Sequence, residues 1–242
     1  MTNALPTTRT EPVTEVTGPP VLLIHGFTAT GDVDFPAERW AAPLAAAGRE
    51  TIVVHLPGHG GGPAVDSADD VTTTRVLERL AEGVGPVSEV DVVGYSLGAR
   101  LAWDLVASKL VPARRLVLGG LSPMEPFAAV DLAVARAAVQ GGPQPTDMLT
   151  GIITGMVSAP GQDSESLLRL VEGLARESFD PAAGAPAVPT LFLAGQEDPM
   201  AQGVDQLVGL IADARLRQVP GDHLGALAGE EFRAAVFEFL GV

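Results

Sequence analysis

A single serine between a predicted strand and a predicted helix constrains this chain more than any other feature. The serine is Ser96, at the centre of the segment GYSLG (residues 94–98). The run VDVV (90–93) before it predicts a buried strand, and ARLAWDLV (99–106) after it predicts a helix without a breaker. Glycines two residues either side of a serine permit a turn too tight for side chains, and such a turn pushes the serine oxygen out over a sheet edge. The segment therefore predicts a serine hydroxyl presented for chemistry.

Short apolar strands alternate with helices along most of the chain. This alternation predicts the α/β class, a mostly parallel, doubly wound sheet with helices on both faces. The first 20 residues are polar, with several Thr and Pro, and predict a loose tail with at most one edge strand around residues 13–16. The predicted strands span 21–25, 51–55, 90–95, 115–119, 189–194 and 215–219, and the predicted helices span 36–47, 73–82, 97–109, 203–212 and 230–240.

The alternation stops between residues 122 and 187. Helical stretches at 130–139 and 164–177 lie there, separated by the breakers GGPQP and APG. The segment is too long for a loop and too short for an independent domain. We expect a mostly helical cap over the carboxyl ends of the strands, where sites occur in such sheets. The expected organisation is a tail (1–20), a core (21–121 and 188–242) and a cap (122–187).

Composition narrows the function. The 242 residues, 46% of them hydrophobic, suit one large globular domain. The net charge of −15 argues against nucleic acids and anionic membrane surfaces as partners. The chain has no cysteine, and its four histidines lack metal-ligand spacing, so we expect no metal and no cofactor. No apolar run suits a bilayer, and the N-terminus lacks the pattern of a signal peptide, so we expect a cytoplasmic protein.

A serine hydroxyl becomes a good nucleophile when a base accepts its proton and a third group orients that base. Asp198 follows the predicted strand 189–194, and His223 follows the predicted strand 215–219. Because the carboxyl ends of parallel strands meet at one edge of a sheet, we expect Ser96, Asp198 and His223 to meet there.

Three other carboxylates compete with Asp198 for the orienting role. Glu197 precedes it, but Asp198 sits nearer the position where a short side chain must turn inward. Asp222 neighbours His223 in sequence, so its side chain should point away from the imidazole. Glu125 follows the strand that ends at residue 119 and is a weaker alternative. Asp198 is therefore the predicted partner of His223.

Acyl transfer also needs hydrogen-bond donors for the developing oxyanion, usually two backbone N–H groups. One predicted donor is Leu97, directly after the serine, and the other is Phe27, in the loop after the strand 21–25. The segment HGGG (59–62) resembles the oxyanion motif of some lipases. It follows the second of the alternating strands, so we interpret it as a structural turn.

Residues next to these donors and in the cap are expected to bind the substrate. The apolar cap side chains suggest a small to medium apolar acyl group, although the same residues could equally pack the cap onto the sheet. The predicted substrate-binding residues are His25, Tyr95, Met124, Phe127 and Met148.

Five segments together resemble the α/β-hydrolase superfamily, in register over about residues 20–242. The resemblance implies a sheet of eight strands or slightly fewer, a cap after the sixth strand, and Ser96, His223 and Asp198 as a catalytic triad. Two departures are His55, where the family commonly has Asp, and Ala99, where a third glycine is common. The segments are HGF (25–27), LPGHG (56–60), GYSLG (94–98), GQED (195–198) and GDH (221–223).

The sequence thus predicts a cofactor-free serine hydrolase that cleaves a carboxylic ester or thioester through an acyl-enzyme. A serine at the nucleophile position argues against epoxide hydrolases and haloalkane dehalogenases, which resemble this chain but use Asp there. Two alternatives remain open: a lyase similar to the menaquinone-pathway enzyme that eliminates pyruvate (SHCHC synthase), and a non-catalytic protein that binds a small molecule. That lyase binds its anionic substrate with cap arginines, for which this chain offers Arg136, Arg169 and Arg176.

Overall fold

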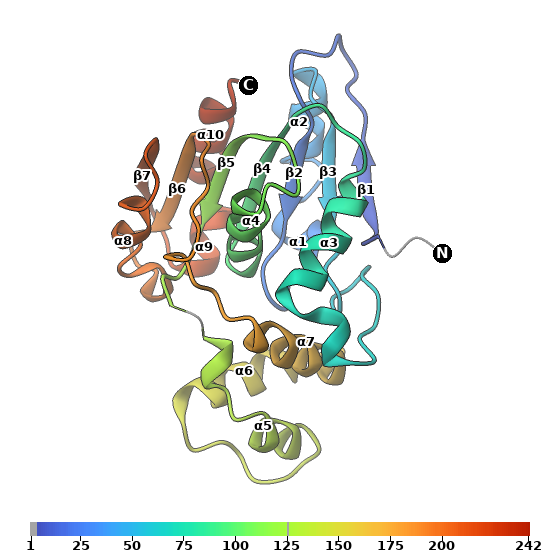
Figure 1. Cartoon of the computed structure of the whole chain (residues 1–242), viewed down its shortest axis with the longest axis vertical. Helices are drawn as coiled ribbons and strands as arrows, with labels where there is room; N and C mark the ends of the chain where they lie inside the picture. The colour runs from blue at the N-terminus through green and yellow to red at the C-terminus, as the bar shows by residue number, and fades with distance from the viewer. Residues whose placement is uncertain (1–3, 125) are drawn as a thin grey trace.

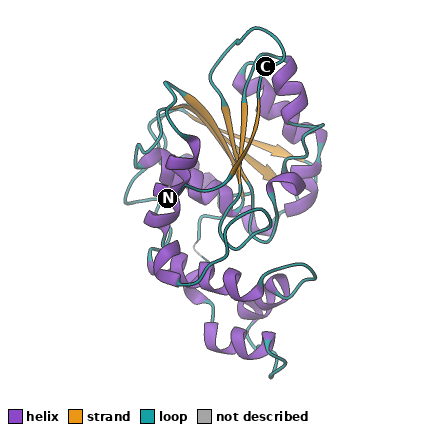
Figure 2. Ribbon diagram, turned by 90° about the vertical axis from the view of Figure 1, so that its right-hand side faces the viewer, coloured by secondary structure: helices purple, strands orange, loops and turns teal. Residues whose placement is uncertain are grey.

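The computed structural model describes residues 4–124 and 126–242. In this part of the chain seven strands form one sheet in the order β1-β3-β2-β4-β5-β6-β7. Neighbouring strands from β3 to β7 are parallel, and β1 runs antiparallel to β3 at the edge. Helices flank the twisted sheet on both sides (Figure 2). The predicted mostly parallel, doubly wound α/β fold is confirmed.

The strands are short and the central ones are fully buried, as parallel strands covered on both faces should be. They are β1 (Thr7–Thr10), β2 (Val21–Ile24), β3 (Thr51–Val54), β4 (Val90–Tyr95), β5 (Ala113–Gly119), β6 (Thr190–Gly195) and β7 (Ala214–Val219). The helices are α1 (Gly31–Asp34), α2 (Ala41–Ala46), α3 (Thr73–Val84), α4 (Leu97–Ala107), α5 (Leu132–Val139), α6 (Met148–Val157), α7 (Ser164–Arg176), α8 (Asp205–Val208), α9 (His223–Ala228) and α10 (Glu230–Leu240). Short 3₁₀ turns are η1 (Ala68–Val71), η2 (Phe127–Ala129) and η3 (Pro199–Ala201).

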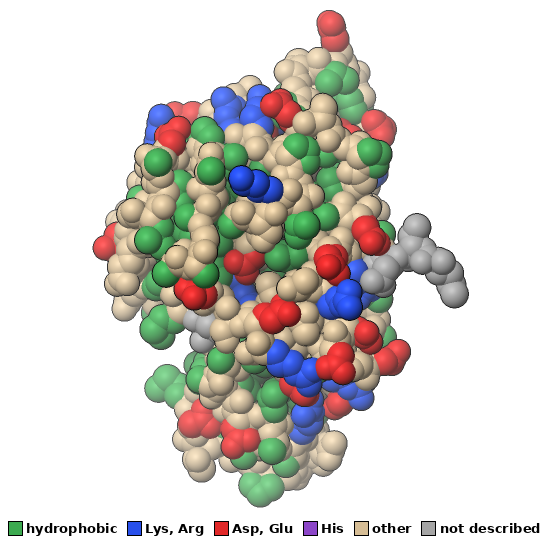
Figure 3. Space-filling model, viewed as in Figure 1, with side chains coloured by type: hydrophobic (Ala, Val, Ile, Leu, Met, Phe, Trp, Pro, Cys, Tyr) green, Lys and Arg blue, Asp and Glu red, His purple; other side chains and the backbone are tan. Residues whose placement is uncertain are grey.

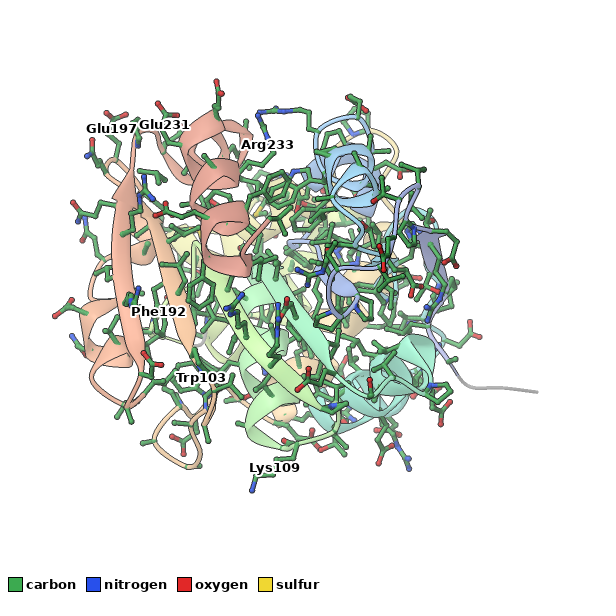
Figure 4. All side chains as sticks on the ribbon, turned by 90° about the horizontal axis from the view of Figure 1, so that it is seen from above. Trp103, Lys109, Phe192, Glu197, Glu231 and Arg233 are labelled. Atoms are coloured by element: carbon green, nitrogen blue, oxygen red, sulfur yellow. The ribbon has the colours of Figure 1, made fainter. Side chains whose placement is uncertain are left out.

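Alternate residues of each central strand face opposite helical layers. Val92 of β4 belongs to the core cluster that contains Trp103 of α4, whereas its neighbour Val93 belongs to the cluster with Trp40 and Phe232 behind the sheet. Figure 4 shows Trp103 beside β6, where its ring lies 6.3 Å from that of Phe192. Full burial of such side chains contributes roughly 1.5–3 kcal/mol each, and it fixes β4 and α4 relative to each other.

The helical insertion between β5 and β6 lies beyond the carboxyl ends of the strands (Figure 1). It contacts the loops that follow β2 and β3. The Val65 N–H donates to the Ser166 hydroxyl at 3.0 Å, and the ring of Phe127 lies 5.3 Å from that of Phe27. Its helix α6 was not predicted from the sequence, because GGPQP before it suggested a loop. Within the described residues, no helix combines the length and the apolarity needed to cross a bilayer.

Four sequence expectations need correction. The edge strand is β1 at residues 7–10, because Arg9 anchors it to Glu50 and to the Val84 carbonyl, whereas Val13 and Val16 lie exposed. The helix predicted over 203–212 shrinks to the single turn α8, and the helix predicted from residue 36 begins as α2 at residue 41. The helical insertion follows the fifth strand rather than the sixth, since a single antiparallel strand opens this sheet.

Candidate active site

Ser96 lies in a strained turn between β4 and α4. Its φ of 53° and ψ of −116° are unusual for a residue with a side chain, and such conformations cost about 1–3 kcal/mol. The Ser96 N–H donates to the Gly119 carbonyl of β5 at 2.8 Å, which ties the turn to the sheet. A Cβ on Gly94 would lie 2.3 Å from the Gly98 carbonyl oxygen, and one on Gly98 would lie 2.0 Å from that of Ile24. Both glycines are therefore required by the close approach of α4 to the sheet.

Asp198 and His223 meet at the carboxyl ends of β6 and β7. Asp198 Oδ2 lies 2.7 Å from His223 Nδ1, and the Asp198 carboxylate is completely buried. The other carboxylate oxygen accepts the Met200 N–H at 2.9 Å, which fixes its orientation. A carboxylate beside Nδ1 keeps the imidazole proton on that nitrogen and leaves Nε2 free to accept another.

The three alternative carboxylates do not take this position. Glu197 is exposed and points outward at the edge of the molecule (Figure 4). Asp222 caps α9, and its Oδ1 accepts the Gly225 N–H at 2.8 Å. Glu125 lies outside the described residues. Of the acids that the structure describes, Asp198 is the one bonded to His223.

Tyr95 supports His223 from behind. Its side chain is only 2% exposed, and its hydroxyl donates to the main-chain carbonyl of His223. The two rings lie 5.3 Å apart, and burial raises the pKa of the Tyr95 hydroxyl above its usual range, so it stays a donor. A Cβ on Gly120 would lie 2.9 Å from both His223 Cε1 and Tyr95 Cζ, so this packing needs a glycine. Tyr95 therefore holds a supporting position behind His223, and its predicted contact with substrate stays a prediction.

His25 is also buried, and both of its ring nitrogens are hydrogen-bonded to the main chain. Its predicted contact with substrate stays a prediction. Its Nε2 accepts the Leu56 N–H at 3.2 Å, so Nδ1 carries the proton and donates to the Gly26 carbonyl at 2.9 Å. Burial lowers the pKa of His25 to about 3, which keeps the ring neutral at ordinary pH. His25 thus joins the loops that follow β2 and β3.

The two predicted oxyanion donors have free N–H groups. Leu97 is the first residue of α4, where helix N–H groups lack intrahelical acceptors. Phe27 lies between two amides that are occupied, since the Gly26 N–H donates to Asp34 Oδ2 at 2.7 Å and the Thr28 N–H donates to His59 Nε2 at 3.0 Å. Among the described residues, neither Phe27 nor Leu97 has an acceptor for its N–H.

The three predicted cap contacts differ in their surroundings. Phe127 is 5% exposed and packs on Phe27, whereas Met124 and Met148 are 74% and 82% exposed. Only Phe127 of these three therefore lies against the loop that holds a predicted oxyanion donor. Within the described residues, no group of three or more acids and histidines could hold a metal ion.

Three side chains that bond to the loop around Phe27 were not predicted: Asp34, His59 and Gln162. The Gln162 side-chain amide donates to the Thr28 carbonyl at 2.8 Å. His59 belongs to the HGGG segment, and its Nδ1 donates to the Pro57 carbonyl at 2.9 Å as a structural turn requires. The HGGG motif drew attention to His59 but did not indicate its contact with Thr28. No local signal marked Asp34 or Gln162, because their partners are distant or in irregular loops.

Comparison with known proteins decides the family. Residues 21–235 match the family model described as "Alpha/beta hydrolase family". The chain belongs to the alpha/beta hydrolase family. This match confirms the family that the five sequence segments resemble and the fold that the resemblance implies.

This alpha/beta hydrolase is 29% identical over 153 residues to the pimeloyl-[acyl-carrier protein] methyl ester esterase of Aromatoleum aromaticum. The match covers 62% of this chain and 53% of that protein, so the chain spans about half the length of this curated relative. Its fold is similar to that of MenH from S. aureus, with a TM-score of 0.72, 19% identity and 97% of each chain covered. It is also similar to the enol-lactonase from Burkholderia xenovorans LB400, with a TM-score of 0.71, 17% identity, and 98% and 96% of the two chains covered.

Proposed function

We propose that this protein is a serine hydrolase that cleaves a carboxylic ester or thioester without a cofactor. The observation that carries the proposal is the 2.7 Å bond between buried Asp198 and His223, at the sheet edge where the strained turn presents Ser96. A family member with an activated serine and two free backbone donors has each part that acyl transfer needs. The ester linkage also agrees with the name of the curated relative, a methyl ester esterase.

The proposed reaction has two halves. His223 Nε2 takes the proton of Ser96 as its oxygen attacks the acyl carbon, and the oxyanion accepts hydrogen bonds from the N–H groups of Phe27 and Leu97. The intermediate expels the alcohol or thiol, which receives the proton from His223. Water then gives a proton to His223 and attacks the acyl-enzyme. The bond between the acyl carbon and the Ser96 oxygen breaks, His223 returns the proton to that oxygen, and the carboxylic acid leaves. Asp198 orients the imidazole and stabilises its charged form throughout.

The surroundings of the cap arginines favour a hydrolase over the lyase alternative. Arg136 pairs with Glu172 at 2.6 Å, Arg176 pairs with Asp69 and Glu172, and Arg169 donates to the Val65 carbonyl at 2.7 Å. Figure 3 shows acidic and basic side chains gathered together over this part of the surface. Partly exposed ion pairs such as these contribute only about 0–1 kcal/mol each, so the preference that they give for a hydrolase is small.

We further propose that residues 122–187 form a cap over the site, that the acyl group is small to medium and apolar, and that the protein acts in the cytoplasm on a small molecule. Burial of Phe127 against Phe27 supports the cap, since it joins the insertion to the loop that carries the predicted donor Phe27.

A fluorophosphonate probe and a series of p-nitrophenyl esters and acyl thioesters test the proposed function. Wild type should be labelled at Ser96 and turn over at least one ester, and Ser96→Ala should lose both properties. Labelling without any turnover would favour a non-hydrolytic enzyme. Folded wild type with neither property would favour a binding protein.

A further inference from the structure

Three side chains from separate parts of the chain hold the loop that carries Phe27. Asp34, the last residue of α1, accepts the Gly26 N–H at 2.7 Å. His59, in the turn after β3, accepts the Thr28 N–H at 3.0 Å. Gln162, between α6 and α7, donates to the Thr28 carbonyl at 2.8 Å. We call residues 26–28 the oxyanion loop, and the three bonds restrain it on both sides of Phe27.

The oxyanion loop needs this restraint because its backbone is strained. Thr28 has a φ of 60°, a left-handed conformation that is rare for a β-branched residue. Its hydroxyl donates to the Phe27 carbonyl at 2.7 Å, which fixes the peptide group between them. Strained conformations persist where surrounding contacts over-determine them, and they concentrate at functional sites. Within the part of the chain that the structure describes, the Phe27 N–H has no acceptor, whereas the other polar groups of the loop are bonded.

The chemistry of His59 and Asp34 suits acceptors at these positions. His59 donates from Nδ1 to the Pro57 carbonyl, so its Nε2 must be the acceptor for Thr28. Burial lowers the pKa of His59 to about 4, which keeps that nitrogen unprotonated at neutral pH. Asp34 Oδ2 and Ser96 Cβ both lie close to Gly26, since a Cβ on Gly26 would be 3.4 Å from each of them.

We propose that Asp34, His59 and Gln162 are positioning residues that hold the Phe27 N–H where the oxyanion develops. The inference rests on the proposed hydrolase function. Gln162 belongs to the helical insertion, so displacement of the insertion releases one of the three restraints. Because misplacement by about 1 Å can cost about a hundredfold in rate, loss of one restraint is costly although each of these side chains acts through the backbone of the oxyanion loop.

The test compares Asp34→Ala, Asp34→Asn and Gln162→Ala with Gln144→Ala, a control at an exposed position of the same insertion. We expect kcat to fall about tenfold or more in Asp34→Ala and Gln162→Ala, with KM changed less than about twofold. Asp34→Asn should recover most of the loss, because an amide oxygen still accepts the Gly26 N–H. Gln144→Ala should match wild type.

A second measurement separates positioning from general damage to the fold. n-Butylboronic acid forms a tetrahedral adduct with an activated serine and places an oxygen at the oxyanion position. Its affinity should fall in parallel with kcat/KM across the variants, while the affinity for butyrate, a ground-state ligand, should not change. Loss of affinity for both ligands together, or unchanged kcat in Asp34→Ala and Gln162→Ala, would overturn the inference.

Hydrogen exchange at the Thr28 amide keeps this test distinct from the test of the proposed function. Faster exchange in Gln162→Ala than in Gln144→Ala is expected whether or not an ester is turned over. Wild type that shows no turnover and no labelling refutes the hydrolase, and the positioning role falls with it. Active wild type with equal exchange in these two variants refutes the positioning role of Gln162 alone.

Discussion

His223 Nδ1 lies 2.7 Å from Asp198 Oδ2, and the carboxylate is shielded from solvent by the chain around it. Loss of the orienting carboxylate in a serine triad costs about ten thousandfold in kcat, so Asp198→Asn should be nearly inactive in ester hydrolysis. Asp222→Asn is the matched control, since asparagine still caps α9. Steady-state kinetics of both variants measure the difference, and similar rates would refute the role of Asp198.

The strain at Ser96 predicts opposite effects on stability and activity. Ser96→Gly should raise the free energy of unfolding by about 1 kcal/mol, because glycine adopts a φ of 53° without steric cost. Ser96→Ala keeps a Cβ and should show no such gain, while both variants should be inactive. Urea denaturation measures the difference. Equal stability of the two variants would mean that the turn stores no strain.

Acid should destabilise the fold through its buried histidines. His59 has its pKa lowered to about 4, and His25 to about 3, from the usual 6.5, so the unfolded chain binds protons that the folded chain does not. Their contribution is fully present above pH 6.5 and is lost as the pH falls toward 4 for His59 and toward 3 for His25. For His59 the loss amounts to roughly 2 kcal/mol at pH 5.

His59→Gln isolates this effect, because glutamine does not titrate. The difference in unfolding free energy between wild type and this variant should shrink as the pH falls from 7 to 5, as urea denaturation at each pH would measure. Curves that stay parallel over that range would contradict a neutral, buried His59.

The contrast in burial among Phe127, Met124 and Met148 of the helical insertion predicts which residue affects acyl-length preference. Phe127→Ala should change the ratio of short-ester to long-ester kcat/KM about tenfold, since it removes a ring packed on Phe27. Met124→Ala and Met148→Ala, at largely exposed positions, should leave the ratio within about twofold of wild type. A larger effect at Met148 than at Phe127 would mean that the exposed face of α6 binds substrate.

The position of the site could be predicted because it follows from local patterns. Apolar runs mark parallel strands, the strand ends share one edge, and Ser96, Asp198 and His223 each follow a strand. The pairing of Asp198 with His223 agrees with that reasoning. Asp198 rather than Glu197 turns toward His223, in agreement with the place that the sequence gives Asp198 in the turn after β6.

Residues that act through distant partners could not be predicted. Gln162 meets a carbonyl 134 positions earlier in the chain, and nothing near it in the sequence identifies that partner. Met148 shows another limit, because α6 carries apolar residues and no charge around its whole circumference. Periodicity then fails to distinguish its buried face from its exposed face.

The ion pairs of Arg136 and Arg176 in the helical insertion have a consequence for product release in the proposed reaction. The ester group of the substrate is neutral, whereas the carboxylate of the acid product carries a negative charge. The chain itself has a net charge of −15. With Arg136 and Arg176 neutralised by carboxylates, little attraction opposes departure of that anion. We therefore expect the net negative charge of the chain to favour release of the acid in the proposed reaction, and inhibition by the accumulated acid should be weak.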